Sequence, residues 1–196
     1  MRMHFLSAIL SGDKTGKLMQ YKMDTKQATV LVDGLSFPNG VALSEDSSFL
    51  LIAETTNSRI LRHWLRTSKA GTTEVFAELP GFPDNIRRSE GRGDFWVALH
   101  SKRSKILELV MWVSPLVDSW LRLLLPSSCV DGLYPLLAGM RPSNGVAVRL
   151  SKEGEMLEVL EDRGGKVLRV ISEVGERNGS LWIGSVLMPF VGLVKL

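Results

Sequence analysis

The stretch FPNGVAL at residues 37–43 indicates the fold class, because similar stretches are repeated later in the chain. It is echoed by PSNGVAV at residues 142–148 and, more loosely, by FPDNI at residues 82–86. Asn39 and Asp84 are 45 positions apart, about the length of one propeller blade. Asp84 and Asn144 are 60 positions apart, which predicts one blade plus an insert. The repeat therefore predicts an all-β propeller, of which this chain holds roughly three to four blades.

Around the repeat, short β-prone runs alternate with Gly, Pro, Asn and Asp, a pattern typical of propellers, barrels and sandwiches. One antiparallel meander with polar turns is predicted from the runs at 40–43, 49–54, 59–65 and 73–78. Further strands are predicted at 17–23, 29–32, 95–99, 167–174, 181–186 and 191–195. Asn178-Gly179 lies between two of the last runs and is a strong hairpin signal.

One segment departs from the β pattern and predicts a short helical insert at about residues 104–126. Trp112 and Trp120 lie near one helical face, and Pro115 would divide the segment into two short helices. Packing against the propeller is the default interpretation. A lid over an axial site and a peripheral membrane contact are the alternatives. Charged residues and Pro115 interrupt the segment, so we do not expect it to span a membrane.

Composition excludes several classes of protein. The 196 residues are 44% hydrophobic and 23% charged, as in an ordinary single globular domain. Twenty-four basic and 21 acidic residues are scattered through both halves, so no nucleic-acid surface is expected, and no partner protein is predicted. Cys129 is the only cysteine, so no internal disulfide can form. The first ten residues, MRMHFLSAIL, lack the features of a signal peptide.

Three long stretches resemble the plant strictosidine synthase-like proteins. They are GLSFPNGVALSEDSSFLLIAETTNSRILRHWL at 34–65, KAGTTEVFAELPGFPDNIRRSEGRGDFWVALHSKRS at 69–104 and LWIGSVLMPFVGLVKL at 181–196. That family is similar to adipocyte plasma membrane-associated protein and, more distantly, to paraoxonases and gluconolactonases. The resemblance implies a six-bladed β-propeller with an axial site, of which residues 1–196 form the C-terminal part, about the last four blades of a single domain. It also implies the endomembrane lumen: endoplasmic reticulum, vacuole or secreted.

Four polar residues are candidates for a metal site. In a propeller the innermost strand of each blade starts at the axis, so Asn39, Asp84, Asn85 and Asn144 are expected to converge there. Their amide and carboxylate oxygens suit calcium, whereas no cluster of His and Cys suits zinc. The competing interpretation is that these residues only form turns. The resemblance implies that Asn39, Asp84 and Asn85 match the calcium positions of paraoxonase-type propellers, while Asn144 enters through internal repetition alone.

Two further residues carry predictions of their own. His100 ends the run Phe95–Leu99 and resembles the histidine that paraoxonases place near their substrate, where an imidazole could move a proton. A packing role is the alternative. Asn178-Gly179-Ser180 is also an N-glycosylation sequon, meaningful only if the protein enters the secretory pathway. The turn explains Asn178 without a glycan.

The resemblance also bears on strictosidine synthesis. In strictosidine synthase the base is a glutamate that lies seven residues before the glycine of the final hairpin. The match places that glycine at Gly179, so the position of the base is occupied here by Ser172. A serine hydroxyl is not a base near neutral pH unless it is activated. Glu173 is adjacent, but strand alternation predicts that its carboxylate turns away from the axis unless a bulge re-aims it.

Three functions remain as hypotheses. The leading one is metal-assisted hydrolysis of a small ester or lactone, in which Asn39, Asp84 and Asn85 hold calcium and His100 moves a proton. The second is a non-catalytic binding or scaffold propeller of the endomembrane system. The third is the condensation of tryptamine with secologanin in alkaloid biosynthesis, which Ser172 disfavours.

Overall fold

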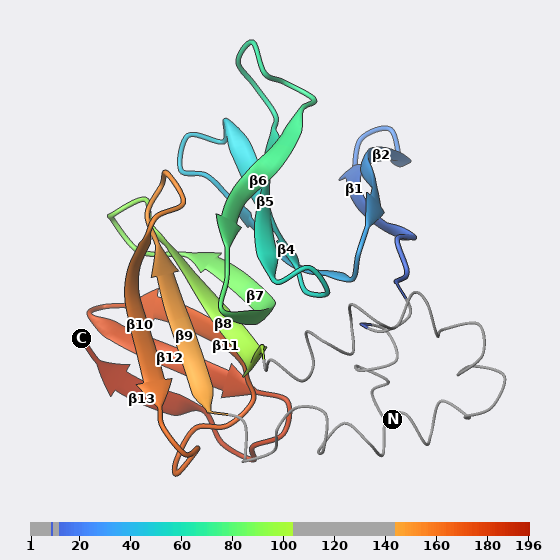
Figure 1. Ribbon diagram of the computed structural model, residues 1–196. Coiled ribbons are helices and arrows are strands. Elements are labelled where there is room, and N and C mark those ends of the chain that lie inside the picture. Colours follow the sequence, from blue (N-terminus) through green and yellow to red (C-terminus); the bar gives the residue numbers. More distant parts are fainter. Residues whose placement is uncertain (1–8, 10–11, 104–143) are drawn as a thin grey trace, which may run out of the picture.

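Thirteen β-strands in four antiparallel sheets make up the described part of the chain, which in this computed structural model is residues 9, 12–103 and 144–196 (Figure 1). The first sheet pairs β1 (Gly16–Lys22) with β2 (Gln27–Leu35). The second follows chain order through β3 (Pro38–Leu43), β4 (Phe49–Glu54), β5 (Arg59–Trp64) and β6 (Thr73–Glu78). It is the predicted meander.

The third sheet contains β7 (Gly81–Arg88), β8 (Phe95–Lys102), β9 (Gly145–Leu150) and β10 (Met156–Asp162). The fourth contains β11 (Ile171–Arg177), β12 (Ser180–Ser185) and β13 (Gly192–Lys195). Successive meanders of this kind confirm the predicted all-β propeller architecture. No helix within the described ranges is long and apolar enough to cross a membrane.

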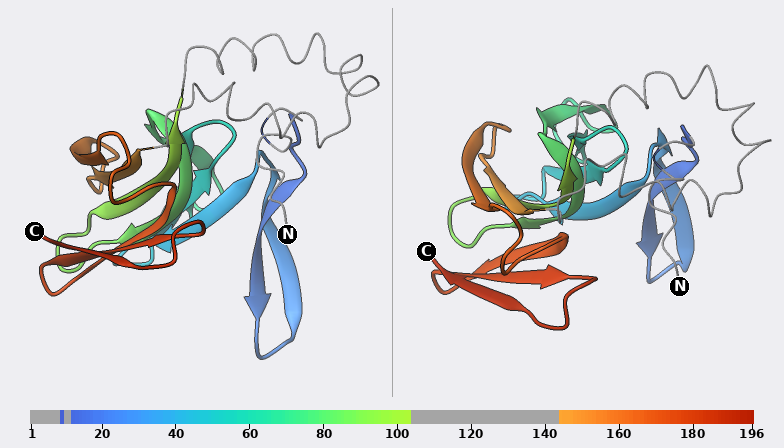
Figure 2. Two further views of the ribbon diagram at one scale, coloured as in Figure 1. Left: turned by 90° about the horizontal axis from the view of Figure 1, so that it is seen from below. Right: turned by 60° about the horizontal axis from the view of Figure 1, so that its bottom comes forward.

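The sheets follow one another like the blades of a fan (Figure 2). Buried apolar side chains fill the space between each pair of neighbouring sheets. Phe49, Phe76 and Phe95 join the second and third sheets, with ring centroids 6.2 to 6.4 Å apart. Each such fully buried side chain contributes roughly 1.5–3 kcal/mol. The first strands of successive sheets are neighbours as well, because β7 packs against both β3 and β11. Residues at the starts of these three strands are thus brought together.

The hairpin predicted at Asn178-Gly179 is present and joins β11 to β12. Both residues have positive φ angles, 51° and 68°, as a type I′ turn requires. Of the predicted strands, 49–54 and 73–78 have the observed bounds, and others differ by a few residues at their ends. The strands β7, β9 and β10 were not among the predicted runs, although copies of the repeat lie within β7 and at the start of β9.

The position of the second copy of the repeat corrects one prediction. Gly145 begins β9, which is the third strand of its sheet and not the first strand of a new one. Asp84 lies in β7 and Asn144 directly precedes β9, so the two copies belong to strands of one sheet, in which β8 is followed along the chain by β9. The spacing of 60 positions between Asp84 and Asn144 predicts one blade plus an insert, but it contains two strands of one sheet and the connection between β8 and β9. The helical insert predicted at 104–126 lies outside the described residues.

Candidate functional site

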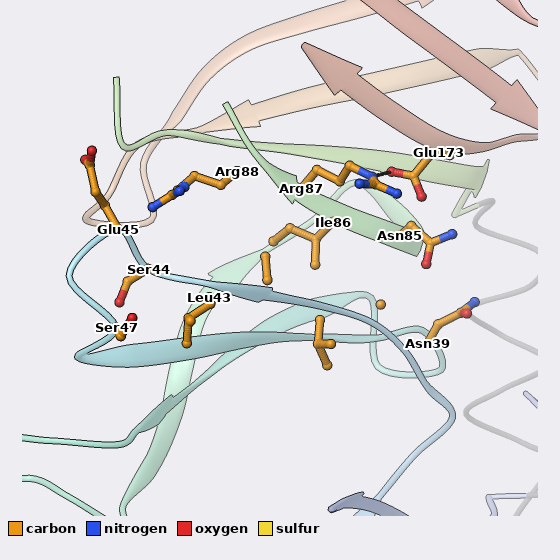
Figure 3. A pocket seen from close by; sticks show the side chains of 13 residues that line it. Asn39, Leu43, Ser44, Glu45, Ser47, Asn85, Ile86, Arg87, Arg88 and Glu173 are labelled. Carbon is orange, nitrogen blue, oxygen red and sulfur yellow. Dashed lines mark hydrogen bonds and ion pairs between the residues drawn. The ribbon is translucent and has the colours of Figure 1, made fainter. Parts of the chain in front are cut away.

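Polar side chains from the first strands of three sheets meet at one place. Asn39 lies at the start of β3, Asp84 and Asn85 lie in β7, and Glu173 lies in β11. The amide nitrogen Nδ2 of Asn39 donates a hydrogen bond of 2.8 Å to Oδ1 of Asp84. Figure 3 shows the side chains of Asn39, Asn85 and Glu173 around the same end of a groove. The repeat thus predicted a real contact between Asn39 and Asp84.

Local irregularities in the sheets place these side chains. The pairing of β3 with β4 shifts register between Pro38 and Val41, which puts Asn39 in the irregular part. The pairing of β7 with β8 shifts register between Phe82 and Ile86, so Asp84 also lies in an irregular part of its sheet. Such bulges re-aim side chains and are frequent next to functional sites.

Gly40 allows the two strands to approach. A Cβ atom on this residue would lie 2.7 Å from Cα of Asn85 and 2.8 Å from N of Ile86, both of them backbone atoms. Backbone cannot swing aside as a flexible side chain can, so any larger residue would push β3 and β7 apart. The Asn-Gly pair is therefore explained by packing as well as by chemistry.

The electrostatics of the site centre on Asp84. Burial raises the pKa of this carboxyl from 3.8 to about 6, and the negative charge of Glu173 adds to the effect. The hydrogen bond from Asn39 acts in the opposite direction, because it favours the ionised form. A cation at this place would stabilise the ionised carboxylate.

Glu173 is the residue that sequence reasoning misplaced. The pairing of β11 with β12 shifts register between Ile171 and Glu173, so simple alternation of side chains does not hold there. Glu173 lines the groove and forms an ion pair with Arg87, in which Nε of Arg87 lies 2.6 Å from Oε1 of Glu173. The prediction that its carboxylate turns away from the site was wrong, for the reason that a bulge re-aims it. Ser172 is buried.

The groove beside these residues has a volume of about 670 Å³. One wall is the length of β3, including the exposed apolar side chains of Val41 and Leu43. The other wall is β7, with Arg87 and Arg88, and Glu173 contributes from β11 (Figure 3). The groove therefore offers both apolar and charged surface to a small molecule.

Asn144 is not part of this cluster. Its side-chain nitrogen donates to the carboxylate of Glu161, and its Oδ1 accepts a 3.0 Å hydrogen bond from N of Gly164. Asn144 therefore fastens the turn after β10 to the start of β9. Because β9 is a third strand, the expected convergence of Asn144 with Asn39 and Asp84 was wrong.

His100 lies in β8, buried, opposite the irregular start of β7 where the register shifts between Phe82 and Pro83. Burial lowers the pKa of its imidazole to about 4, so the ring is neutral at neutral pH. His100 is not among the residues that line the groove. Its role as a proton carrier stays a prediction.

Asn178 lies at the exposed tip of its hairpin, where its backbone N–H donates a 3.0 Å hydrogen bond to the carboxylate of Glu90. The turn function is thereby confirmed. A glycan on the Asn178 side chain stays a prediction.

The donor set suits a hard cation only in part. Within the described ranges, no three His, Cys, Asp or Glu side chains are grouped closely enough to hold a metal ion. The cluster instead offers amide oxygens of Asn39 and Asn85 beside the carboxylate of Asp84. Calcium takes about six to eight oxygen ligands, with amide and carboxylate oxygens among them. The side-chain oxygens of this cluster and the raised pKa of Asp84 fit such an ion. Its further ligands would come from water, substrate or other residues.

Solved structures with the same fold define the class of protein. A gluconolactonase from Xanthomonas campestris matches with a TM-score of 0.58 and 15% identity, over 91% of this chain and 44% of its own. A luciferin-regenerating enzyme matches with a TM-score of 0.56 and 15% identity, over 88% and 45%. The calcium-binding protein regucalcin from Agrobacterium tumefaciens matches with a TM-score of 0.52 and 14% identity, over 91% and 48%. These matches show the fold of the chain, which is that of part of a β-propeller.

Sequence comparison finds relatives that are similar over the whole chain. The family model described as strictosidine synthase matches residues 1–68. Strictosidine synthase-like protein 10 of Arabidopsis thaliana is 53% identical over 198 residues, which cover 100% of this chain and 51% of that protein. Strictosidine synthase-like protein 3 of the same plant is 46% identical, over 100% and 49%. The chain is similar to these strictosidine synthase-like proteins over its whole length and spans about half of theirs.

Proposed function

We propose that the natural protein containing this chain hydrolyses a small ester or lactone with the help of a calcium ion. The observation that carries the proposal is the 2.8 Å hydrogen bond between Asn39 and Asp84, which joins the first strands of two sheets beside Glu173 of a third. Oxygen ligands from separate blades thus meet at the end of an open groove. The names of two proteins with the same fold, a gluconolactonase and a calcium-binding protein, agree with this chemistry.

The residues would divide the work as follows. Asp84, Asn39 and Asn85 would hold the ion, which when bound polarises a carbonyl and lowers the pKa of a water molecule. The Nδ2 group of Asn39 orients the carboxylate of Asp84 through its hydrogen bond. The imidazole of His100 is unprotonated at neutral pH because its pKa is about 4, so it would act there only as a weak base.

The groove itself would select the substrate. Val41 and Leu43 expose 58% and 47% of their surface along one wall, which favours a substrate with an apolar portion. Arg88 on the other wall suits a carbonyl, hydroxyl or carboxylate group. The carboxylate of Glu173, although paired with Arg87, adds negative charge beside Asp84, which favours a cation there.

A panel of esters and lactones tests the proposal on the full-length natural protein, with and without a calcium chelator. Turnover that requires calcium and falls about 100-fold or more in Asp84→Asn is the expected result, because that change removes the charge that holds the ion. Asp46→Asn is the matched control, since Asp46 lies in the β3–β4 turn and binds Ser44 and Ser48. Absence of any calcium-dependent turnover would overturn the proposal in favour of a non-catalytic binding propeller.

A further inference from the structure

We infer that Thr55 is the positioning residue of this site, because it ties together the two strand starts that carry Asn39 and Asp84. Its backbone N–H donates a 3.1 Å hydrogen bond to the carbonyl oxygen of Phe37. Its hydroxyl Oγ1 donates a 2.7 Å hydrogen bond to the carbonyl oxygen of Pro83. One buried residue outside both strands thus contacts the backbone just ahead of each candidate ligand.

The two strand starts need such a tie because ordinary sheet pairing does not fix them. Asn39 and Asp84 both lie where the ladders shift register. Phe37 also has a φ of 53°, a left-handed conformation that a bulky residue adopts only when its surroundings impose it. The hydrogen bond from Thr55 to Phe37 is one such constraint.

The turn that carries Thr55 is itself anchored. Glu54 is 2% exposed, and its carboxylate accepts hydrogen bonds from N of Ser36 at 2.8 Å and from Nε of Arg59 at 2.6 Å. A charged group buried with two donors holds its position closely. Thr55 is the next residue in the chain, so the anchoring of Glu54 also restricts the position of the Thr55 hydroxyl beside Pro83.

The neighbouring residue supplies a matched control. Thr56 is also buried, but its hydroxyl has no hydrogen-bond partner among the residues that the structure describes. Valine has nearly the shape of threonine without the hydroxyl. Thr55→Val would leave the buried carbonyl of Pro83 without its donor, whereas Thr56→Val removes no observed bond. Thr55→Ser keeps the hydroxyl and should restore the wild-type behaviour.

The inference rests on the proposed calcium site, so its test has one readout that needs no metal. In the full-length natural protein, hydrogen–deuterium exchange of residues 82–88 is compared among wild type, Thr55→Val, Thr55→Ser and Thr56→Val. Calcium affinity of the same four proteins is measured by titration calorimetry. We expect faster exchange and about tenfold weaker calcium binding in Thr55→Val alone, as for other residues that support ligands.

The outcomes separate the two proposals. If the wild type binds no calcium, the proposed function fails, and exchange in residues 82–88 alone decides the role of Thr55. If Thr55→Val behaves like Thr56→Val in both measurements, the inference is overturned. It is equally overturned if Thr55→Val loses its fold altogether, because Thr55 would then serve the whole domain and not the site.

Discussion

Gly40 is the single residue on which the approach of β3 to β7 depends most directly. Gly40→Ala would place a Cβ 2.7 Å from Cα of Asn85, and overpacking of this kind costs roughly 1–3 kcal/mol. The free energy of unfolding in urea should fall by about that amount. Gly175→Ala is the control, because a Cβ there meets only Cδ of Arg87, at an ordinary 3.7 Å. Equal losses in the two variants would show that Gly40 is not specially constrained.

His100 gives the protein a stability that depends on pH. Its folded-state pKa of about 4 is below the unfolded value near 6.5, so the unfolded chain binds the proton more tightly. The stabilisation is present above pH 6.5 and is lost as pH falls toward 4, by roughly 3 kcal/mol in all. Melting temperatures measured from pH 7 to pH 4 should fall less steeply in His100→Gln. An identical pH profile for this variant and the wild type would contradict the assignment.

At this scale the sequence predicted residue types better than residue directions. Asn39 and Asp84 were found because the repeat placed both at strand starts, and the structure joins them by a hydrogen bond. Asn144 has the same local sequence but directly precedes the third strand of its sheet, β9, and a local pattern does not contain the order of strands in a sheet. Thr55 was missed because its role consists of two bonds to distant backbone, without any motif.

Among the strands, β11 bears on strictosidine synthesis, because it carries Ser172 and Glu173. Its bulge turns Glu173 toward the groove, where the ion pair with Arg87 holds the carboxylate. Ser172 has no basic side chain. We therefore expect no strictosidine when tryptamine and secologanin are supplied to the full-length natural protein and the product is measured by mass spectrometry. Turnover that disappears in Glu173→Gln would show that Glu173 acts as a base in place of a residue at position 172.

Elements with strong local signals were predicted well. The Asn178-Gly179 turn and the meander of the second sheet have turn residues that specify their geometry. The strands of the third sheet were harder, since a long connection separates β8 from β9. Bulges in β3, β7 and β11 were not predicted, because they depend on how neighbouring sheets pack.

At the scale of the whole molecule, the 196-residue chain has apolar surface at both ends of its row of sheets. The first sheet exposes Met19 and Tyr21, its turn exposes Met23, and the fourth sheet exposes Trp182 and Leu193. Exposed apolar faces and unpaired strand edges promote association. The isolated chain should therefore form oligomers or aggregates in size-exclusion chromatography with light scattering. A monomer that melts cooperatively would contradict this expectation.

Thermal melting of the full-length natural protein with and without calcium shows whether the ion binds at Asp84. Calcium that binds only the native state at a hundredfold excess over its dissociation constant adds about 2.7 kcal/mol of stability. The melting temperature should rise in the wild type and in Asp46→Asn, and the rise should be lost in Asp84→Asn. Because the pKa of Asp84 is about 6, protons compete with the ion, and the rise should shrink below that pH. A calcium-induced rise of the same size in Asp84→Asn would rule out a calcium site at this residue.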